Sequence, residues 1–277
     1  MSVAATRPRE GRPQIRHLTR ELLQDVPGTY RALVTPTEAG LVAGLGLLDP
    51  RAGSLPAGQW HVLVAEGARR AAGEPIVEIV GTAAELAAAE DQVLGPLGYA
   101  GGIAGRCRDL VEGCPDGLRI ACGGWKKLPG PLKPLLRAGL SVGGVTPRLV
   151  EGDFVYIDKN VVLLLGGIET AVHAAAALDH GPPAVQVTSV PEALHATRAG
   201  AGIVMVDTGD LSMLADTHAA LRAARLRDHV VLAFAGGVTA DDLTQVHQAG
   251  AEVVDLGRAI LDAPLWDLHV EVIGTVA

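Results

Sequence analysis

Lysines, an aspartate and several glycines follow short apolar runs that are typical of β-strands. Lys126 and Lys127 come soon after the apolar segment 118–122, and Asp207 directly follows the segment 202–206. A lysine side chain carries a mobile point charge that suits a phosphate, a pyrophosphate or a carboxylate. These positions predict contacts with an anionic ligand. The alternatives are an exposed loop lysine and an aspartate that only caps the following turn.

Two glycine-containing loops near the end of the chain predict a phosphate site. Gly236-Gly237 and Gly257-Arg258 each follow an apolar segment. Glycine lets backbone N–H groups approach an anion closely, and the positive end of the next helix adds to the attraction. Thr239 and Arg258 are further candidates for the phosphate. Tight turns, a helix cap and a solvent-exposed arginine are the alternatives.

From about residue 117, apolar strand candidates alternate with amphipathic helical segments. The strand candidates are residues 118–122, 154–157, 184–188, 202–206, 230–234 and 253–256. The helical segments are residues 168–178, 191–198, 211–224 and 240–248. Near-continuous apolar strands between helices are typical of a parallel sheet, whose reacting groups lie at the carboxyl ends of the strands. The pattern predicts an open or incomplete α/β barrel, with a flavodoxin-like sheet as the alternative.

The first part of the chain has a different organisation. Residues 1–28 are rich in arginine and proline, and they predict a loose arm leading into a short helix over 17–23. Short apolar runs separated by turns predict a small sheet over about 30–80. Thr82 and Glu85 have the spacing of a capping box, which predicts that a helix begins there.

The composition argues against several classes of protein. Of the 277 residues, 48% are hydrophobic and only 3% are aromatic, which suits α/β layers better than a β-sandwich. A net charge of −8 argues against nucleic acid as the main partner. No apolar run approaches the roughly 20 residues that cross a bilayer, and the start of the chain lacks a secretory signal. We therefore expect a cytoplasmic protein with reduced cysteines that binds neither nucleic acid nor membranes.

Residues 123–130 resemble the Asp-Thr-Arg-Lys-Thr-x-Pro-Gly motif of the quinolinate phosphoribosyltransferases, with Lys126, Pro129 and Gly130 as the matching residues. Further motifs of that family follow in the same order and at similar spacing. They are Gly143-Gly144, Pro147-Arg148 in place of His-Arg, Asp158-Lys159-Asn160-Val161 in place of Lys-Asp-Asn-His, the strand ending at Asp207, and residues 234–239 in place of Ala-Ser-Gly-Gly-Val-Thr. The resemblance spans roughly residues 30–270.

This resemblance implies a fold, a reaction and an assembly. The fold is an α/β-sandwich domain over residues 29–116 and an open α/β barrel over residues 117–277, including the C-terminal segment, as in type II phosphoribosyltransferases. The donor is phosphoribosyl pyrophosphate, with Mg²⁺ implied as a cofactor at Asp207. A homodimer or larger assembly is also implied. In it the first domain of one subunit covers the barrel of another and places Glu90 and Asp91 at a shared site.

Several residues take roles from the family motifs that they match. Lys126 matches a lysine that contacts bound substrates, and Arg148 could clamp a carboxylate or phosphate with two hydrogen bonds. Together they would stabilise the leaving pyrophosphate. Asn160 matches in place, and Asp207 fits the family acid that holds ribose hydroxyls or Mg²⁺. The two late glycine loops fit the family site for the 5-phosphate.

Other positions depart from the family in a consistent direction. Where the family has cationic or imidazole side chains, this chain has Asp91, Trp125, Pro147 and Asp158. Alternation along a strand would turn the carboxylate of Asp158 to the side where the family has a cation. Two acidic family positions are Gln186 and Ala233 here. Because the missing cations would neutralise the two carboxylates of quinolinate, we expect a different acceptor.

The sequence therefore predicts transfer of a ribose 5-phosphate group to an aromatic or heteroaromatic acceptor with at most one acid group. Trp125 suits stacking on a flat ring, with a hydrophobic plug as the alternative. The other residues expected to contact substrates are Asp91, Lys127, Asp158, Asn160 and Gln186. Two other classes stay open: a non-catalytic phosphosugar-binding protein, and a lyase or decarboxylase in which Lys126 or Lys127 forms an imine.

Overall fold

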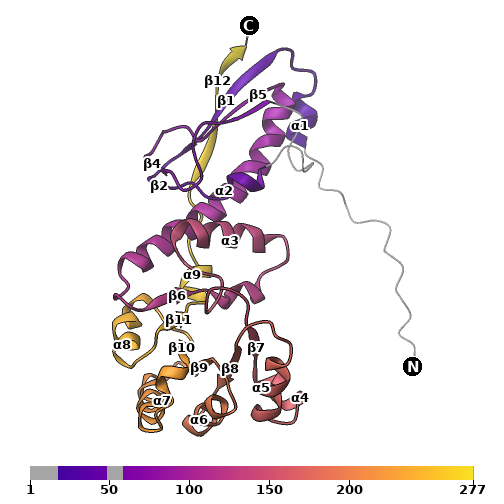
Figure 1. Cartoon of the computed structure of the whole chain (residues 1–277). Helices are drawn as coiled ribbons and strands as arrows, with labels where there is room; N and C mark the ends of the chain where they lie inside the picture. The colour runs from indigo at the N-terminus through magenta and orange to yellow at the C-terminus, as the bar shows by residue number, and fades with distance from the viewer. Residues whose placement is uncertain (1–17, 49–58, 277) are drawn as a thin grey trace, which may run out of the picture.

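A four-stranded sheet and a six-stranded sheet lie at opposite ends of the molecule, with a long helix between them (Figure 1). The structure is a computed structural model that describes residues 18–48 and 59–276. Of the predicted arm over residues 1–28, residues 1–17 lie outside the described part. The remainder of the arm holds the short helix α1 (Leu18–Leu23).

The larger sheet is parallel, as predicted, and its strand order is β6-β11-β10-β9-β8-β7. Its strands are β6 (Arg119–Ala121), β7 (Val155–Ile157), β8 (Pro183–Val187), β9 (Ile203–Asp207), β10 (Val231–Ala235) and β11 (Val253–Asp255). This order leaves β6 and β7 as the two edges of the described sheet. The result is an open α/β barrel rather than a closed one.

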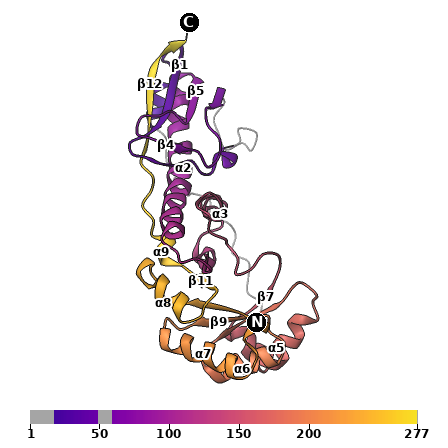
Figure 2. The same cartoon turned by 60° about the vertical axis from the view of Figure 1, so that its left-hand side comes forward.

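Helices cover the outer face of the barrel sheet (Figure 2). They are α5 (Ile168–Ala176), α6 (Val190–Arg198), α7 (Leu211–Ala223) and α8 (Leu243–Gln248). The short helix α4 (Lys159–Leu164) contacts α5, and α9 (Arg258–Leu261) contacts α2. Along β9, Val204 and Val206 pack against the covering helices. Ile203 and Met205 instead belong to a separate cluster on the inner face of the sheet. Since side chains alternate along a strand, Asp207 continues the inner row.

Two predicted elements of the barrel were wrong in detail. Asp158 does not continue a strand, because β7 ends at Ile157 and Asp158 is the N-cap of α4. Its carboxylate accepts the free backbone N–H groups of Asn160 and Val161 at 2.9 and 3.0 Å, which is what favours aspartate at a helix start. The predicted helix 240–248 begins instead as a 3₁₀ turn, η5 (Ala240–Asp242), before α8.

The smaller sheet has the order β12-β1-β5-β3, and a separate ribbon pairs β2 with β4. The strands are β1 (Thr29–Pro36), β2 (Gly40–Leu41), β3 (Gln59–Val62), β4 (Arg69–Arg70), β5 (Val77–Gly81) and β12 (Leu268–Val276). The capping box of Thr82 and Glu85 is confirmed at the start of α2 (Ala83–Glu112). Helix α2 also packs against α3 (Leu132–Gly143), which follows the barrel's first strand. It thereby joins the two parts of the molecule.

The end of the chain returns to the first sheet. After α9, Trp266 packs among buried residues of the N-terminal part, and its indole N–H donates to the Glu38 carbonyl at 3.1 Å. Strand β12 then pairs antiparallel with β1 over its whole length. Residues 268–276 thus belong to the N-terminal sheet, and the division of the chain at residue 117 stays a prediction. In the described residues, no helix is both long and apolar enough to span a membrane.

Candidate active site

A pocket of about 1040 Å³ opens at the carboxyl ends of the barrel strands. Loops after β6, β7, β10 and β11 contribute to it, together with inward side chains of β7, β8, β9 and β11. Its polar and charged lining residues are Arg106, Lys126, Lys127, Arg148, Tyr156, Asp158, Gln186, Asp207, Thr239, Asp255, Arg258 and Asp262. This is the end of a parallel barrel where reacting groups are expected.

Most of the residues predicted for the site line this one pocket. They are Trp125, Lys126, Lys127, Arg148, Asp158, Gln186, Asp207, Gly236, Gly237, Thr239, Gly257 and Arg258. Asn160 is exposed in the first turn of α4 and is not among the lining residues of the described chain. Asp91 lies within α2, and its side chain is outside the described part. The functional roles of all these residues stay predictions.

The turn after β6, η3 (Gly123–Lys127), carries two cations and an indole. The ammonium of Lys126 lies over the ring of Tyr156, 4.2 Å from its centre. Trp125 is half-buried against the barrel core, and Lys133 and Arg137 of α3 lie 5.3 and 5.9 Å from its ring. Cations placed over aromatic rings are attracted by the ring quadrupole. The turn therefore holds Lys126 over the ring of Tyr156 and Trp125 beside the cations of α3.

An amide and a carboxylate form a pair on the inner face of the barrel. The side-chain amide of Gln186 in β8 donates to Asp207 in β9 at 2.8 Å. Because the amide holds one carboxylate oxygen, the side chain of Asp207 has a fixed orientation at the mouth of the barrel. A carboxylate held this way can accept hydrogen bonds from ligand hydroxyl groups or contribute to a metal site.

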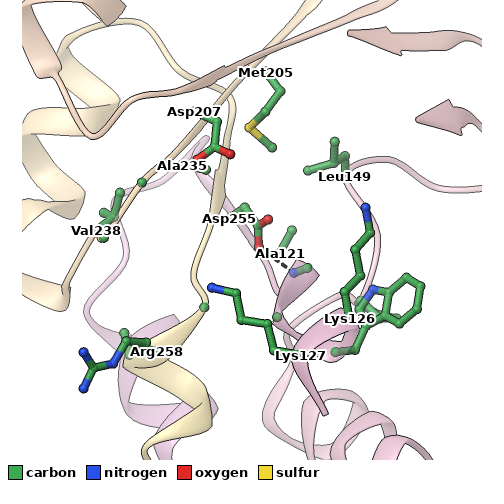
Figure 3. Close-up of a pocket in the computed structure, with 18 of the residues that line it drawn as sticks. Ala121, Lys126, Lys127, Leu149, Met205, Asp207, Ala235, Val238, Asp255 and Arg258 are labelled. Carbon is green, nitrogen blue, oxygen red and sulfur yellow. Dashed lines mark hydrogen bonds between the residues drawn. The ribbon is translucent and has the colours of Figure 1, made fainter. Parts of the chain in front are cut away.

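A second carboxylate lies nearby, between the two lysines of the turn (Figure 3). Asp255, at the end of β11, accepts a hydrogen bond from the backbone N–H of Gly123. Burial raises the pKa of this carboxyl group above its usual value, the Gly123 N–H lowers it, and Asp207 adds to the rise. Lys126 and Lys127 lower it again. Asp255 thus links the first and last loops of the site.

Tyr156 places a neutral hydroxyl group on the same inner face of the barrel. Burial raises the pKa of its phenol, and the charges of Asp207, Asp255 and Asp158 raise it further. The hydroxyl therefore stays protonated at every physiological pH. The inner face of the barrel consequently carries carboxylates, an amide and a phenol, whereas the cations come mainly from the surrounding loops.

The late glycine loops differ in what their glycines do. Gly236 has a φ of +113°, and a Cβ there would lie 2.3 Å from the Gly209 backbone nitrogen, so loop packing alone requires glycine. Gly237 has a φ of +78°, yet a Cβ there would meet nothing within 4 Å. Its backbone is therefore open to the pocket. Thr239 caps the next turn with Asp242, whose carboxylate accepts from both its N–H and its hydroxyl at 2.8 Å.

The two arginines predicted to contact anions already have carboxylate partners. Arg148 donates to Asp153 at 2.6 Å and also to the Gly152 carbonyl. Arg258 pairs with Asp262 at 3.0 Å, and its side chain is 85% exposed. Such exposed pairs are weak, so either guanidinium can exchange its partner for a more highly charged anion.

Carboxylates of the pocket do not form a metal cage by themselves. Among the residues that the structure describes, no group of three or more His, Cys, Asp or Glu side chains could hold a metal ion. Mg²⁺ is usually held by one or two carboxylates together with substrate phosphates. Asp207 fits that role only if a ligand supplies the remaining oxygens, so the predicted Mg²⁺ stays a proposal.

Sequence reasoning missed four polar residues of the pocket, one of which is Asp262, the ion-pair partner of Arg258. Asp255 and Tyr156 are inward members of strand rows, and each lies two residues before a position that had been selected, Gly257 and Asp158 respectively. Strand alternation could have found both. Arg106 comes from the last third of α2 and donates to the Ala259 carbonyl at 3.5 Å. No local signal in the sequence indicates that α2 reaches the barrel.

Comparison with known proteins agrees with this geometry. The family model "Quinolinate phosphoribosyl transferase, C-terminal domain" matches residues 103–271, which is more than half of the chain. A probable nicotinate-nucleotide pyrophosphorylase (carboxylating) of Methanothermobacter thermautotrophicus is 29% identical, over 93% of each chain. The nicotinate-nucleotide pyrophosphorylase (carboxylating) of Rattus norvegicus is 30% identical, over 90% of this chain and 88% of the relative.

A solved structure supports the fold independently. The nicotinate-nucleotide pyrophosphorylase of Francisella tularensis superposes with a TM-score of 0.76 at 21% identity, covering 93% of this chain and 90% of that one. The predicted architecture, an N-terminal domain followed by an α/β barrel, is therefore confirmed. The chain belongs to the quinolinate phosphoribosyltransferase family.

Proposed function

We propose that the protein transfers a phosphoribosyl group from phosphoribosyl pyrophosphate to a flat aromatic or heteroaromatic acceptor with at most one acid group. Membership of the family supports phosphoribosyl transfer as the class of reaction. The relatives are named nicotinate-nucleotide pyrophosphorylases, and the matching family model is named for quinolinate. The choice of a different acceptor rests on the pocket of this chain.

One observation carries that choice. Trp125, Pro147 and Asp158 stand where the family resemblance expects cationic or imidazole side chains, and all three line the same pocket. Three of the four departures therefore meet in one cavity, whereas the fourth, Asp91, lies in α2. The three change the charge of the cavity in which the acceptor would lie.

The charge balance of the pocket points the same way. Five cationic side chains line it, Arg106, Lys126, Lys127, Arg148 and Arg258, against the four carboxylates of Asp158, Asp207, Asp255 and Asp262. Two of the arginines are already paired. A pyrophosphate-bearing donor would engage Lys126 and Arg148, the latter in exchange for its exposed partner Asp153. Few would remain for a dicarboxylate, and burying an unpaired carboxylate is costly.

In the proposed reaction, the lone pair of the acceptor nitrogen forms the bond to the anomeric carbon. The bond to pyrophosphate breaks, and its electron pair leaves with the pyrophosphate. Lys126 and Arg148 would stabilise that leaving charge, and Asp207 would hold ribose hydroxyls. The loops of Gly237 and Gly257 would anchor the 5-phosphate through backbone N–H groups. Catalysis would come mainly from orientation and charge stabilisation.

Mg²⁺ would arrive with the donor rather than reside in the protein. Asp207 would supply a carboxylate and the pyrophosphate would supply oxygens. Mg²⁺ is usually bound by this combination of ligands. When bound, it would offset charge on the leaving group. The protein's own contribution is the orientation that Gln186 gives to Asp207.

We also infer a homodimer or larger assembly in which the first domain of one subunit covers the barrel of another. Glu90 is exposed in α2 and is not among the residues of the described chain that line the pocket. If Glu90 and Asp91 belong to a site, a second subunit must bring them there. Sedimentation that shows only a monomer at micromolar concentration would contradict this inference.

The proposal is tested by measuring pyrophosphate release from phosphoribosyl pyrophosphate and Mg²⁺ with a panel of ring acceptors. The panel would be chosen from ligands that native mass spectrometry finds on the protein purified from its own host. A nucleotide product with a neutral or one-acid ring is expected, and Lys126→Ala should reduce its formation. Tight binding of ribose 5-phosphate without turnover of any acceptor would indicate a phosphosugar-binding protein instead. Borohydride trapping of a substrate on Lys126 or Lys127 would indicate imine chemistry.

A further inference from the structure

The carboxylate of Asp255 has hydrogen-bonding capacity that the protein does not use. In the described residues, its hydrogen-bond donor is the Gly123 N–H, and no lysine or arginine comes within ion-pair distance. The residue lines the pocket at the end of β11. Asp255 is partly buried, and a carboxylate that faces a pocket with spare acceptor sites points to a donor on the ligand.

The position of Asp255 ties it to the acceptor side of the pocket. It pairs in register with Ala121 of β6, so it lies beside the turn that carries Trp125. A Cβ on Gly123 would lie 2.5 Å from the second carboxylate oxygen, so the turn needs glycine to accommodate Asp255. Asp207 lies two strands away on β9, where Gln186 holds it, and the proposed function assigns this carboxylate to ribose.

The surroundings of Asp255 disfavour its negative charge. Burial raises the pKa of its carboxyl group and Asp207 raises it further, while Lys126 and Lys127 offset only part of the shift. The titratable and charged groups that interact with it electrostatically come from β6 and its turn, from β7 and from β9; they are Cys122, Lys126, Lys127, Tyr156 and Asp207. A ligand N–H group would compensate the charge, whereas a ligand carboxylate would add to the repulsion.

We propose that Asp255 is a specificity-determining residue that accepts a hydrogen bond from an N–H group on the acceptor ring. The acceptor class is then a nitrogen heterocycle with an amide or amino substituent. This inference rests on the proposed function, because it places the acceptor beside Trp125. A ribose hydroxyl could supply the same kind of donor, so the experiment must separate the two sources.

The experiment compares nicotinamide with nicotinate as ring probes, using calorimetric titration without phosphoribosyl pyrophosphate. The two molecules have the same shape, but one presents an N–H donor and the other a carboxylate. The wild-type protein should prefer nicotinamide by roughly tenfold or more, the factor that a hydrogen bond to a charged group supplies. Asp255→Asn should lose most of this preference. Its amide oxygen can still accept the Gly123 N–H, so the turn should keep its place.

Two further measurements exclude a merely structural effect. Nicotinamide binding to the wild-type protein should weaken as pH falls through the raised pKa of Asp255, because the neutral acid is a poorer acceptor. Binding to Asp255→Asn should not follow that pH dependence. The variant should also be at least as stable as the wild type at neutral pH, since it removes a charge that burial disfavours. Asp216→Asn, an exposed change on α7, is the matched control and should leave the preference intact.

Three outcomes would overturn the inference. Equal losses of nicotinamide and nicotinate affinity would mean that Asp255 acts through the shape of the pocket. A loss of ribose 5-phosphate affinity with an unchanged ring preference would assign Asp255 to the sugar. A wild-type preference for nicotinate would contradict the proposed repulsion between Asp255 and a ligand carboxylate. If the ring preference depends on Asp255 but no acceptor releases pyrophosphate, this inference stands and the proposed function fails.

Discussion

The two sides of the pocket differ in how closely they follow the family. On the side proposed to bind phosphate, the loops with Gly236-Gly237 and Gly257 keep the glycines that the family motifs lead one to expect. On the side proposed to bind the acceptor, Trp125, Pro147 and Asp158 stand where the family resemblance expects cationic or imidazole groups. A phosphate held by backbone N–H groups needs loop geometry rather than particular side chains. A ring is recognised by side chains, which can change while the fold and the phosphate loops are kept.

The largest expected effect is on the phosphate side. Gly237→Asp would place a carboxylate in the open space above the loop, and it should abolish stabilisation of the protein by phosphate or ribose 5-phosphate. That stabilisation amounts to about 2.7 kcal/mol at a ligand concentration of 100 times Kd. The measurement is the melting temperature as a function of ligand concentration.

Gly237→Asn is the matched control for that substitution. It has the same size and the same left-handed backbone, at φ +78°, but it carries no charge. Both variants should lose about 1–2 kcal/mol of unfolding free energy from the backbone conformation. Only the aspartate should remove the phosphate response completely. An unchanged melting shift in Gly237→Asp would mean that the anion binds elsewhere.

The next effect concerns Lys126, which follows Trp125 in the turn after β6. Lys126→Ala removes the ammonium above Tyr156, and it should weaken pyrophosphate binding by about tenfold, as expected for a lost hydrogen bond between charged groups. Binding of inorganic phosphate should change less, because the glycine loops hold it. Lys159→Ala, an exposed lysine outside the pocket, is the control. Equal losses for both anions in a calorimetric titration would contradict the assignment.

A smaller effect is expected when a cation is returned to the acceptor side. Trp125→Arg should increase the affinity for quinolinate by roughly two- to fivefold, since a partly exposed ion pair contributes about 0.5–1 kcal/mol. Trp125→Leu keeps an apolar side chain and should not show this gain. If both variants bind quinolinate equally, Trp125 does not face the acceptor.

The smallest effect is a pH dependence next to the phosphate loop. Hydrogen bonds from the Thr239 backbone and hydroxyl hold the pKa of Asp242 below its usual value. Its stabilisation of the loop is therefore present at neutral pH, and it disappears as pH falls through that lowered pKa. Melting curves of the wild type and Asp242→Asn should differ slightly at neutral pH and converge in acid. A constant difference at all pH values would contradict this account.

Much of the barrel could be predicted because its signals are local. Apolar strands and amphipathic helices alternate, and the site residues were selected from that rhythm together with the family motifs. Asp158 was misplaced because a strand end and a helix cap look alike when an apolar run precedes an aspartate. The cap became evident only from the N–H groups of Asn160 and Val161.

The parts of the site that could not be predicted depend on distant contacts. Arg106 reaches the pocket only because α2 runs from the N-terminal sheet to the barrel (Figure 1). The pairing of β12 with β1 joins the two ends of the chain, and no local pattern records it. Asp255 is different, because strand alternation could have found it; only its contact with the distant Gly123 N–H needed the structure.

The central claim is that the acceptor side of this pocket no longer suits quinolinate. The most direct test is the rate at which the purified protein forms nicotinate mononucleotide from quinolinate and phosphoribosyl pyrophosphate with Mg²⁺. The rat relative would be assayed in parallel as the reference. The account predicts a kcat/KM for quinolinate at least about a hundredfold below that of the relative, as expected when about two charge-assisted contacts are lost. A comparable kcat/KM, or rescue of a nicotinate auxotroph by this gene, would contradict it.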